Sequence, residues 1–260
     1  MKKKKSALLF LCFVMTFCTL FGTCLAGNRE NSQDFLEANR AYETGDLTKA
    51  IRIYEDLVAH AGVSASLCYN LANSYARTGQ TGKAVLEYER ALLLAPGDGD
   101  IRTNLERLRR EKGLFQKEIP WWQKMGSLMG LNQWTVLAAI ILLALALLHL
   151  ATMRFTVSSR LSSSLTGVFL LLLGISSAGV AIQYRNWQQA VIVAPDARLL
   201  ISPFDGAGST GAIEEGRLIR IIKRHDSYAL INDENGRSGW VPDSSFAFIA
   251  MIMADNKKPL

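Results

Sequence analysis

Apolar and polar positions divide the chain into stretches of different periodicity. Three apolar segments without acidic, lysine or arginine residues stand out, at residues 7–26, 134–153 and 165–184. Residues 31–111 instead place apolar side chains three and four positions apart, which is typical of amphipathic helices. After residue 187 the pattern changes to short β-rich runs separated by turn residues. The chain is therefore predicted to consist of several small pieces rather than one large domain.

The N-terminus has the layout of a secretory signal. Four lysines precede the apolar stretch, and the polar residues Gly27 and Asn28 follow it. We expect residues 1–26 to be a signal peptide that is cleaved after Ala26. Two alternatives are an uncleaved anchor, because about 20 apolar residues can span a bilayer, and a lipoprotein acylated at Cys24. Under all three interpretations, the chain from Asn28 onward is expected outside the cytoplasm.

The two later apolar segments are predicted to be transmembrane helices. As helices, residues 134–153 and 165–184 would each be about 30 Å long, which matches the hydrocarbon layer of a bilayer. Residues 154–164 are too few for a domain, so the two spans should form an antiparallel hairpin. Residues 112–133 are expected to be a linker or interfacial segment. The lipid bilayer is therefore an expected partner.

Small residues suggest how the two predicted spans would pack. Gly174, Ala178 and Ala181 share a face of the second span. Small side chains allow helices to approach closely where lipid supplies no hydrophobic drive. We therefore expect this face to contact the first span.

Residues 31–98 repeat with a shift of 34 residues, and identical residues recur in the two copies. The matched pairs are Ala38 with Ala72, Gly45 with Gly79, Lys49 with Lys83, Ala50 with Ala84, and Tyr54 with Tyr88. Alanines let two helices pack closely, and the glycines suit a left-handed residue at a helix end. The pattern resembles the tetratricopeptide repeat (TPR) family. The resemblance implies an all-α TPR helical repeat, with repeats at 31–64 and 65–98 and a capping helix at 100–111.

The TPR resemblance also implies a binding surface. In that family the first helix of each repeat lines a concave groove. The positions that correspond here, taken as a peptide-binding groove, are Phe35, Asn39, Tyr42, Tyr69, Asn73 and Arg77. Asparagine can hold an extended peptide backbone and aromatic rings can receive its side chains. The alternative is that Phe35 and Tyr69 belong to the core. Two repeats and a cap are near the minimum for a continuous core, so we expect a partner or the membrane to support it.

The C-terminal part is predicted to be all-β. Expected strands lie at residues 190–194, 198–201, 217–223, 228–232, 239–241 and 246–249. The run from Glu215 to Ile221 and the sequence Gly239, Trp240, Val241, Pro242 resemble bacterial SH3-like domains. This resemblance implies an SH3-like barrel over residues 190–250. Cell-wall peptide and a protein partner both remain possible as its ligand.

Charge and candidate chemistry exclude several classes of function. Removing the four N-terminal lysines leaves 25 basic and 23 acidic residues, so nucleic acid is not an expected partner. Cys68 is the lone cysteine after residue 26, and it can neither close an internal disulfide nor build a zinc site. The two soluble parts are thus expected to fold on their own cores. His60, His149 and His225 fall in different predicted pieces. We predict no catalytic residues, no metal site and no cofactor, and therefore no enzyme.

The order of signal peptide, TPR repeats, membrane hairpin and SH3-like domain resembles the BatE-type TPR proteins of bacterial aerotolerance (Bat) operons. The resemblance implies a non-catalytic scaffold in the bacterial inner (cytoplasmic) membrane, with both soluble domains in the periplasm. It also implies partners among membrane proteins with von Willebrand A domains and a MoxR-type ATPase system. The alternative is a cell-wall module that binds peptidoglycan through the SH3-like domain.

Overall fold

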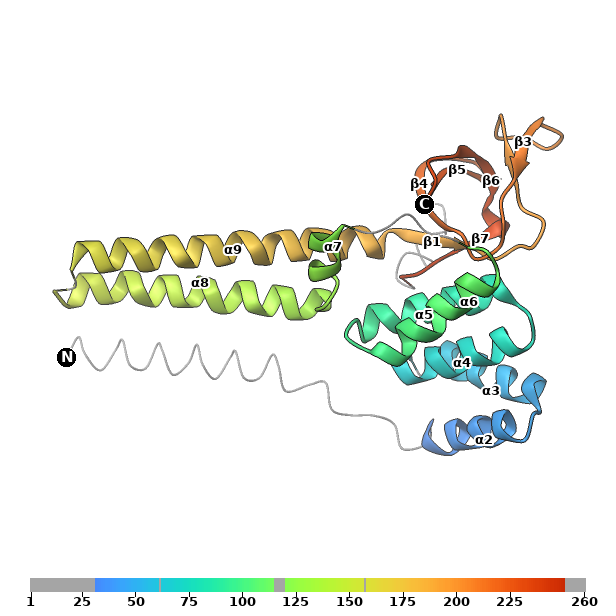
Figure 1. Ribbon diagram of the computed structural model, residues 1–260, viewed down its shortest axis with the longest axis horizontal. Coiled ribbons are helices and arrows are strands. Elements are labelled where there is room, and N and C mark those ends of the chain that lie inside the picture. Colours follow the sequence, from blue (N-terminus) through green and yellow to red (C-terminus); the bar gives the residue numbers. More distant parts are fainter. Residues whose placement is uncertain (1–30, 61, 115–119, 157, 251–260) are drawn as a thin grey trace.

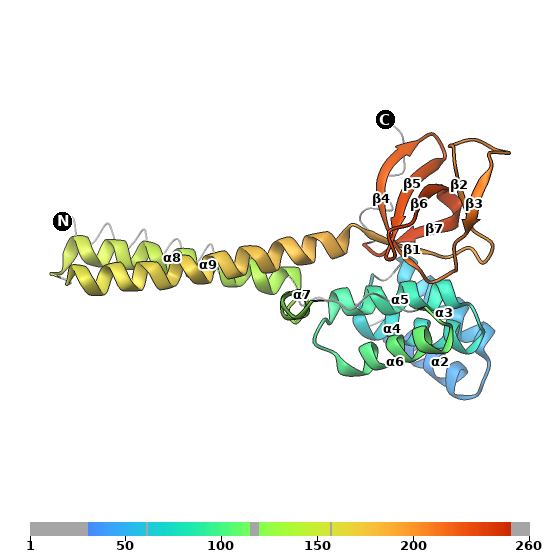
Figure 2. The same cartoon turned by 45° about the horizontal axis from the view of Figure 1, so that its top comes forward.

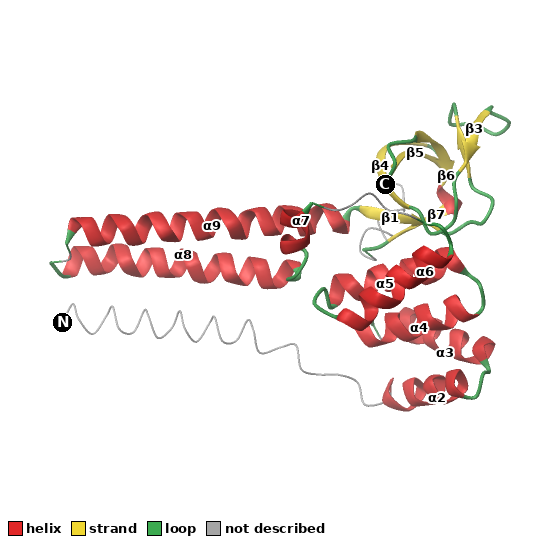
Figure 3. Ribbon diagram, viewed as in Figure 1, coloured by secondary structure: helices red, strands yellow, loops and turns green. Residues whose placement is uncertain are grey.

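The computed structural model describes residues 31–60, 62–114, 120–156 and 158–250. A rod of two long helices projects from a body in which a helical array lies beside a β-sheet (Figure 1). The colouring by secondary structure shows the same division, with the strands gathered at one corner of the body (Figure 3). The expected signal peptide, residues 1–26, lies outside the described residues.

Five helices build the helical array as antiparallel neighbours. They are α2 (Asn31–Glu43), α3 (Leu47–His60), α4 (Ala65–Arg77), α5 (Thr81–Leu94) and α6 (Gly99–Glu111). The repeated alanines Ala38, Ala50, Ala72 and Ala84 are completely buried. Because none of them has a side chain beyond Cβ, the helices within each pair can pack closely. The predicted TPR-like helical region is confirmed.

The connections between these helices follow the local chemistry of the sequence. Gly45 and Gly79 have φ of +85° and +76°, so each lets the chain leave the first helix of its pair in a left-handed turn. The hydroxyl of Ser64 accepts a hydrogen bond from the Leu67 amide and caps α4. Asp98 caps α6 in the same way through the amides of Asp100 and Ile101.

The rod consists of α8 (Leu131–Arg154) and α9 (Ser159–Trp187), preceded by the short helix α7 (Trp121–Gly126). By length and composition, α8 and α9 are both able to cross a membrane, with mean hydropathies of 2.6 and 2.2 in their most apolar stretches. Only 6% and 11% of those stretches is buried. Their leucines therefore face outward instead of forming the core of a globular domain.

The contact between α8 and α9 differs from the predicted one. Gly174 has open space around it, and Ala178 and Ala181 are exposed. The buried positions of α9 are instead Ser176, Gly179 and Gln183. A Cβ atom at Gly179 would lie 2.4 Å from the ring of Trp134, so this glycine provides the hollow that the large indole needs.

Seven strands form one antiparallel sheet after the rod. They are β1 (Gln189–Ile192), β2 (Arg198–Leu200), β3 (Ser209–Ala212), β4 (Leu218–His225), β5 (Tyr228–Asp233), β6 (Ser238–Pro242) and β7 (Phe246–Phe248), in the order β3-β2-β6-β5-β4-β1-β7. The all-β prediction is confirmed, but the predicted barrel is wrong because the sheet is not closed. Of the described strands, β3 pairs with β2 and β7 pairs with β1, which leaves two edges. All four residues of β3 are exposed, so no burial draws this edge toward the other.

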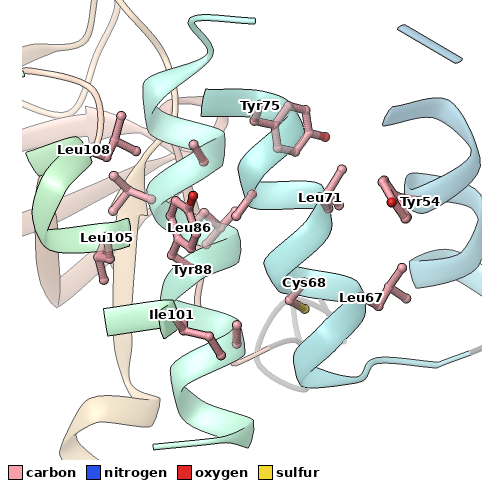
Figure 4. Close-up of a cluster of buried hydrophobic side chains, with 14 of the residues drawn as sticks. Tyr54, Leu67, Cys68, Leu71, Tyr75, Leu86, Tyr88, Ile101, Leu105 and Leu108 are labelled. Carbon is pink, nitrogen blue, oxygen red and sulfur yellow. The ribbon is translucent and has the colours of Figure 1, made fainter. Parts of the chain in front are cut away.

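The sheet packs against α5, and the two soluble parts share a core. Val191 and Ile249 belong to the same buried cluster as the helical repeats (Figure 4 shows its helical members). A Cβ atom at Gly82 would lie 2.7 Å from the carbonyl oxygen of Ile192, so the α5 backbone touches the sheet backbone. The expectation of two independent cores is therefore wrong, because an apolar face of the sheet covers the outer side of α5. The sheet also provides the support that we expected from a partner or the membrane.

Polar contacts join the same two parts. The Gly82 amide donates to the Glu215 carboxylate at 3.0 Å. The guanidinium of Arg90 donates to the carbonyl oxygens of Phe248 and Ile249, at 3.0 and 3.2 Å, and its Nη1 lies 2.5 Å from Glu87. Both side chains of this ion pair are largely buried. The end of the sheet is thus held by one arginine of α5.

Candidate functional site

The six predicted groove residues lie on the first helices of the two repeats. Phe35, Asn39 and Tyr42 come from α2, and Tyr69, Asn73 and Arg77 come from α4. Arg77 is exposed and the other five are half-buried. Each set steps along its helix by three or four residues, so its members lie on one face.

Asn39 is the centre of a hydrogen-bond cluster in the first repeat. Its Oδ1 accepts a bond from the Tyr54 hydroxyl at 2.6 Å and a second from Asn70 Nδ2 at 3.0 Å. The ring of Phe35 meets the ring of Tyr54 edge-on, with 6.1 Å between centroids. One asparagine thereby joins the two helices of its own repeat and the first helix of the next.

The second repeat reproduces this cluster 34 residues later. The Asn73 Oδ1 accepts a bond from the Tyr88 hydroxyl and a weaker one, at 3.4 Å, from Asn104 Nδ2. Asn104 also donates to the Tyr69 hydroxyl at 2.7 Å, and the rings of Tyr69 and Tyr88 lie 6.1 Å apart. We call the two clusters together the asparagine ladder, defined by Asn39, Asn70, Asn73 and Asn104.

A third contact ties the two repeats together at the far end of the groove. The guanidinium carbon of Arg77 lies 4.8 Å from the centre of the Tyr42 ring. Its Nη1 also donates to the Tyr42 carbonyl oxygen at 3.2 Å. Because a cation over an aromatic face is attracted to the ring, the exposed arginine is held in position across the two helices.

Burial keeps the ladder tyrosines protonated. It raises the pKa of Tyr54 to about 12, and it raises the pKa of Tyr88 as well. Both hydroxyls therefore remain donors at neutral pH, and each asparagine Oδ1 accepts two hydrogen bonds. With both lone pairs occupied, the oxygen has little capacity left for a ligand.

The ladder consequently presents donors to the groove. Within the part of the chain that the structure describes, the Nδ2 amides of Asn39 and Asn73 have no hydrogen-bond partner. A carbonyl oxygen of an extended peptide is the natural partner for such an amide. The arrangement suits binding of a peptide backbone and contains no group that is placed to transfer a proton or attack a substrate.

The structure brings most of the predicted groove residues into contact, directly or through one intermediary. Tyr42 touches Arg77, while Tyr69 and Asn73 are joined by Asn104. Phe35 and Tyr69 lie at the edge of the core, half-buried against the ladder tyrosines, so they contribute both to packing and to the groove wall.

Asn104 was absent from the predicted site although the sequence contains its signal. It lies 34 residues after Asn70, the same shift that relates the two repeats. The helix α6 therefore places an asparagine where a third first helix would place it. Arg107 of α6 donates to Asn104 Oδ1 at 2.5 Å and adds a second exposed cation to this side of the array.

Comparison with protein families identifies part of this region. Residues 65–98, which include α4 and α5, match the family model of the tetratricopeptide repeat. No curated protein sequence matches the chain. The family is typically non-catalytic, and its repeats generally bind other proteins.

Proposed function

We propose that this protein is a non-catalytic, membrane-anchored scaffold that binds a protein segment along the groove of its repeats. The observation that supports this function best is the asparagine ladder, which repeats at the TPR period and keeps amide donors toward the groove. The match of residues 65–98 to the repeat family supports the same function. The six groove residues are then peptide contacts, with Tyr42 and Arg77 at one end.

In this proposal α8 and α9 cross the bilayer as an antiparallel hairpin. Their exposed leucines support this, because an aqueous location would leave a long apolar surface in water. A hairpin returns the chain to the side it came from, and the contact between α5 and the sheet agrees with both soluble parts being on that side. The export signal at the N-terminus would make that side the periplasm.

The proposed system is the one that the domain order implies. A BatE-type protein would hold membrane proteins with von Willebrand A domains near a MoxR-type ATPase during stress tolerance or envelope maturation. The order of apolar segments, repeats and β-module supports this assignment. The proposed partner is accordingly a membrane protein whose soluble part lies on the same side as the groove.

Photo-cross-linking in intact cells tests the groove. A benzophenone amino acid would replace Tyr42 or Arg77, one variant at a time, and cross-linked proteins would be identified by mass spectrometry. Arg52, exposed on the second helix α3, provides a control position on another face. Partner adducts from Tyr42 and Arg77 but not from Arg52 are expected. Equal adducts from all three positions, or none from the groove, would contradict the proposal.

A further inference from the structure

The short helix α7 and the turn that follows it carry a group of exposed apolar side chains beside the rod. Trp121 is 76% exposed, Trp122 50%, Met125 57% and Leu128 48%. We infer that these four residues form a membrane foot, a surface that lies in the headgroup layer of the bilayer and fixes the tilt of the repeats. This inference rests on the proposed insertion of α8 and α9.

The foot is attached firmly to the rod at Gly126. The carbonyl oxygen of Gly126 accepts a hydrogen bond from the Trp134 indole at 2.9 Å and a longer one, at 3.4 Å, from Gln183. Gln183 also donates to the Met129 carbonyl oxygen at 2.7 Å. A Cβ atom at Gly126 would lie 2.5 Å from Ile182, so α7 rests directly on α9. These bonds satisfy carbonyls at the end of a helix, which is needed close to lipid.

The length of the rod places this attachment at the membrane surface. The apolar stretch of α8 runs from Trp134 to Met153, which is 20 residues. At about 1.5 Å per residue it covers about 30 Å, the thickness of the hydrocarbon layer. Trp134 and Gln183 therefore mark one boundary of that layer. Because α7 packs beside them and not farther along the rod, its exposed side chains lie at the level of the headgroups (Figure 2).

The chemistry of the foot suits that layer better than it suits water or a protein partner. Indole rings have an apolar body and a polar N–H and favour the membrane interface. Lys124, exposed on the same helix, can reach anionic headgroups. The surface also continues directly from the lipid-facing side chains of α8 and α9, so a bilayer that covers the rod would meet the foot. We therefore commit to lipid as the occupant.

The foot would also determine where the repeats lie. A Cβ atom at Gly97, in the turn between α5 and α6, would be 3.9 Å from the Leu128 carbonyl oxygen. One at Gly130 would be 3.8 Å from the Pro96 ring. The turn after the second repeat therefore rests on the segment that follows α7. With that turn held at the bilayer, the groove has one orientation relative to the membrane surface.

Spin-label depth measurements test this inference on the full chain. The protein would be reconstituted in vesicles of phosphatidylcholine and phosphatidylglycerol, in a background with the four native cysteines replaced. Single nitroxides would replace Met125 in the foot, Leu143 in α8, or Phe204 in the exposed β2–β3 connection. Accessibility to oxygen and to a water-soluble nickel chelate gives the depth of each label.

The expected result is a deep label at Leu143, an aqueous label at Phe204, and a label at Met125 near the headgroup boundary. If the Met125 label is as accessible to nickel as the Phe204 label while Leu143 is deep, the foot is wrong and the anchor stands. A Met125 label shielded from both reagents indicates protein contact and also overturns the foot. If the Leu143 label is aqueous, the proposed insertion fails, and the foot fails with it.

A second variant separates lipid contact from the attachment of α7. Replacing Trp121, Trp122 and Met125 together by serine removes the apolar surface and leaves Gly126, Trp134 and Gln183 intact. A label at Leu128 is then expected to lose its headgroup depth and become accessible to nickel, while Leu143 stays deep. An unchanged depth at Leu128 would show that lipid contact of these side chains does not hold the foot.

Discussion

Arg90 is the residue through which α5 holds the sheet, and its replacement by methionine tests the shared core. Methionine keeps much of the side-chain volume but removes every donor. The change leaves the Glu87 carboxylate buried without its cation and leaves the carbonyls of Phe248 and Ile249 without the guanidinium. Side-chain exposures of 14% for Arg90 and 6% for Glu87 place the pair away from solvent. Solvent screening can therefore compensate little of the loss.

Removal of one partner from a buried ion pair typically costs about 3–5 kcal/mol of unfolding free energy. For a folded unit of this size, 1 kcal/mol corresponds to about 2–4 °C in melting temperature. We therefore expect Arg90→Met to lower the melting temperature by on the order of 10 °C. Amide hydrogen exchange should accelerate at the contact between α5 and the sheet.

The variant Glu87→Gln separates the charge from the carbonyl contacts. Burial raises the pKa of Glu87 more than Arg90 lowers it. The folded state thus binds this proton more tightly than the unfolded state does. The stability contributed by the protonated group is present below the unfolded pKa and is lost as pH rises through the folded pKa. Glutamine resembles the protonated acid, so this variant should lack that pH dependence and match or exceed the wild type above the window.

The assay is thermal unfolding of the full chain in detergent, with hydrogen exchange read by mass spectrometry. In the Glu87→Gln background no buried charge is stranded, so Arg90→Met should cost only the unsatisfied carbonyls, about 1–3 kcal/mol. If Arg90→Met shifts the melting temperature equally in both backgrounds, the reasoning about a buried charge is refuted.

Three further predictions follow from buried contacts. Cys68 is completely buried and burial raises its pKa, so a maleimide should label it only after denaturation, and rapid labelling of the native protein would contradict this. Gly82→Ala should lower the unfolding free energy by about 1–3 kcal/mol because its Cβ meets sheet backbone, whereas Gly99→Ala, with open space, should leave denaturant midpoints nearly unchanged; similar midpoints for both would refute the close contact. Gly179→Val should displace Trp134 and reduce cysteine cross-linking between α8 and α9, whereas the control Gly174→Val should not, and equal yields would argue against this packing.

The helical repeat could be predicted because its determinants are local and recur. Ala38 and Ala72 mark helix crossings wherever they occur, and Gly45 and Gly79 mark helix ends through their own backbone freedom. The same period carries Asn70 onto Asn104, so the ladder was within reach of the sequence. Its donor and acceptor roles were not, because they depend on which oxygen each tyrosine meets.

The contact of the sheet with α5 could not be predicted, because it joins residues far apart in the chain. Gly82 and Glu215 are separated by 133 positions, and neither carries a local signal of the other. The strand β3 gave no alternating apolar pattern because all of its residues are exposed. Gly174 and Gly179 look alike in sequence, and only the position of Trp134 shows which of them is a contact.

The junction between the rod and the sheet makes the molecule a lever. The helix α9 ends at Trp187 and β1 begins at Gln189, so Gln188 is the one residue between them. β1 pairs with β4 and β7, and the end of β7 is gripped by Arg90. Rotation of α9 about its axis would therefore turn the sheet, and the sheet would carry α5 with it. A force applied at one face of the membrane could in this way change the angle at which the repeats hold their partner.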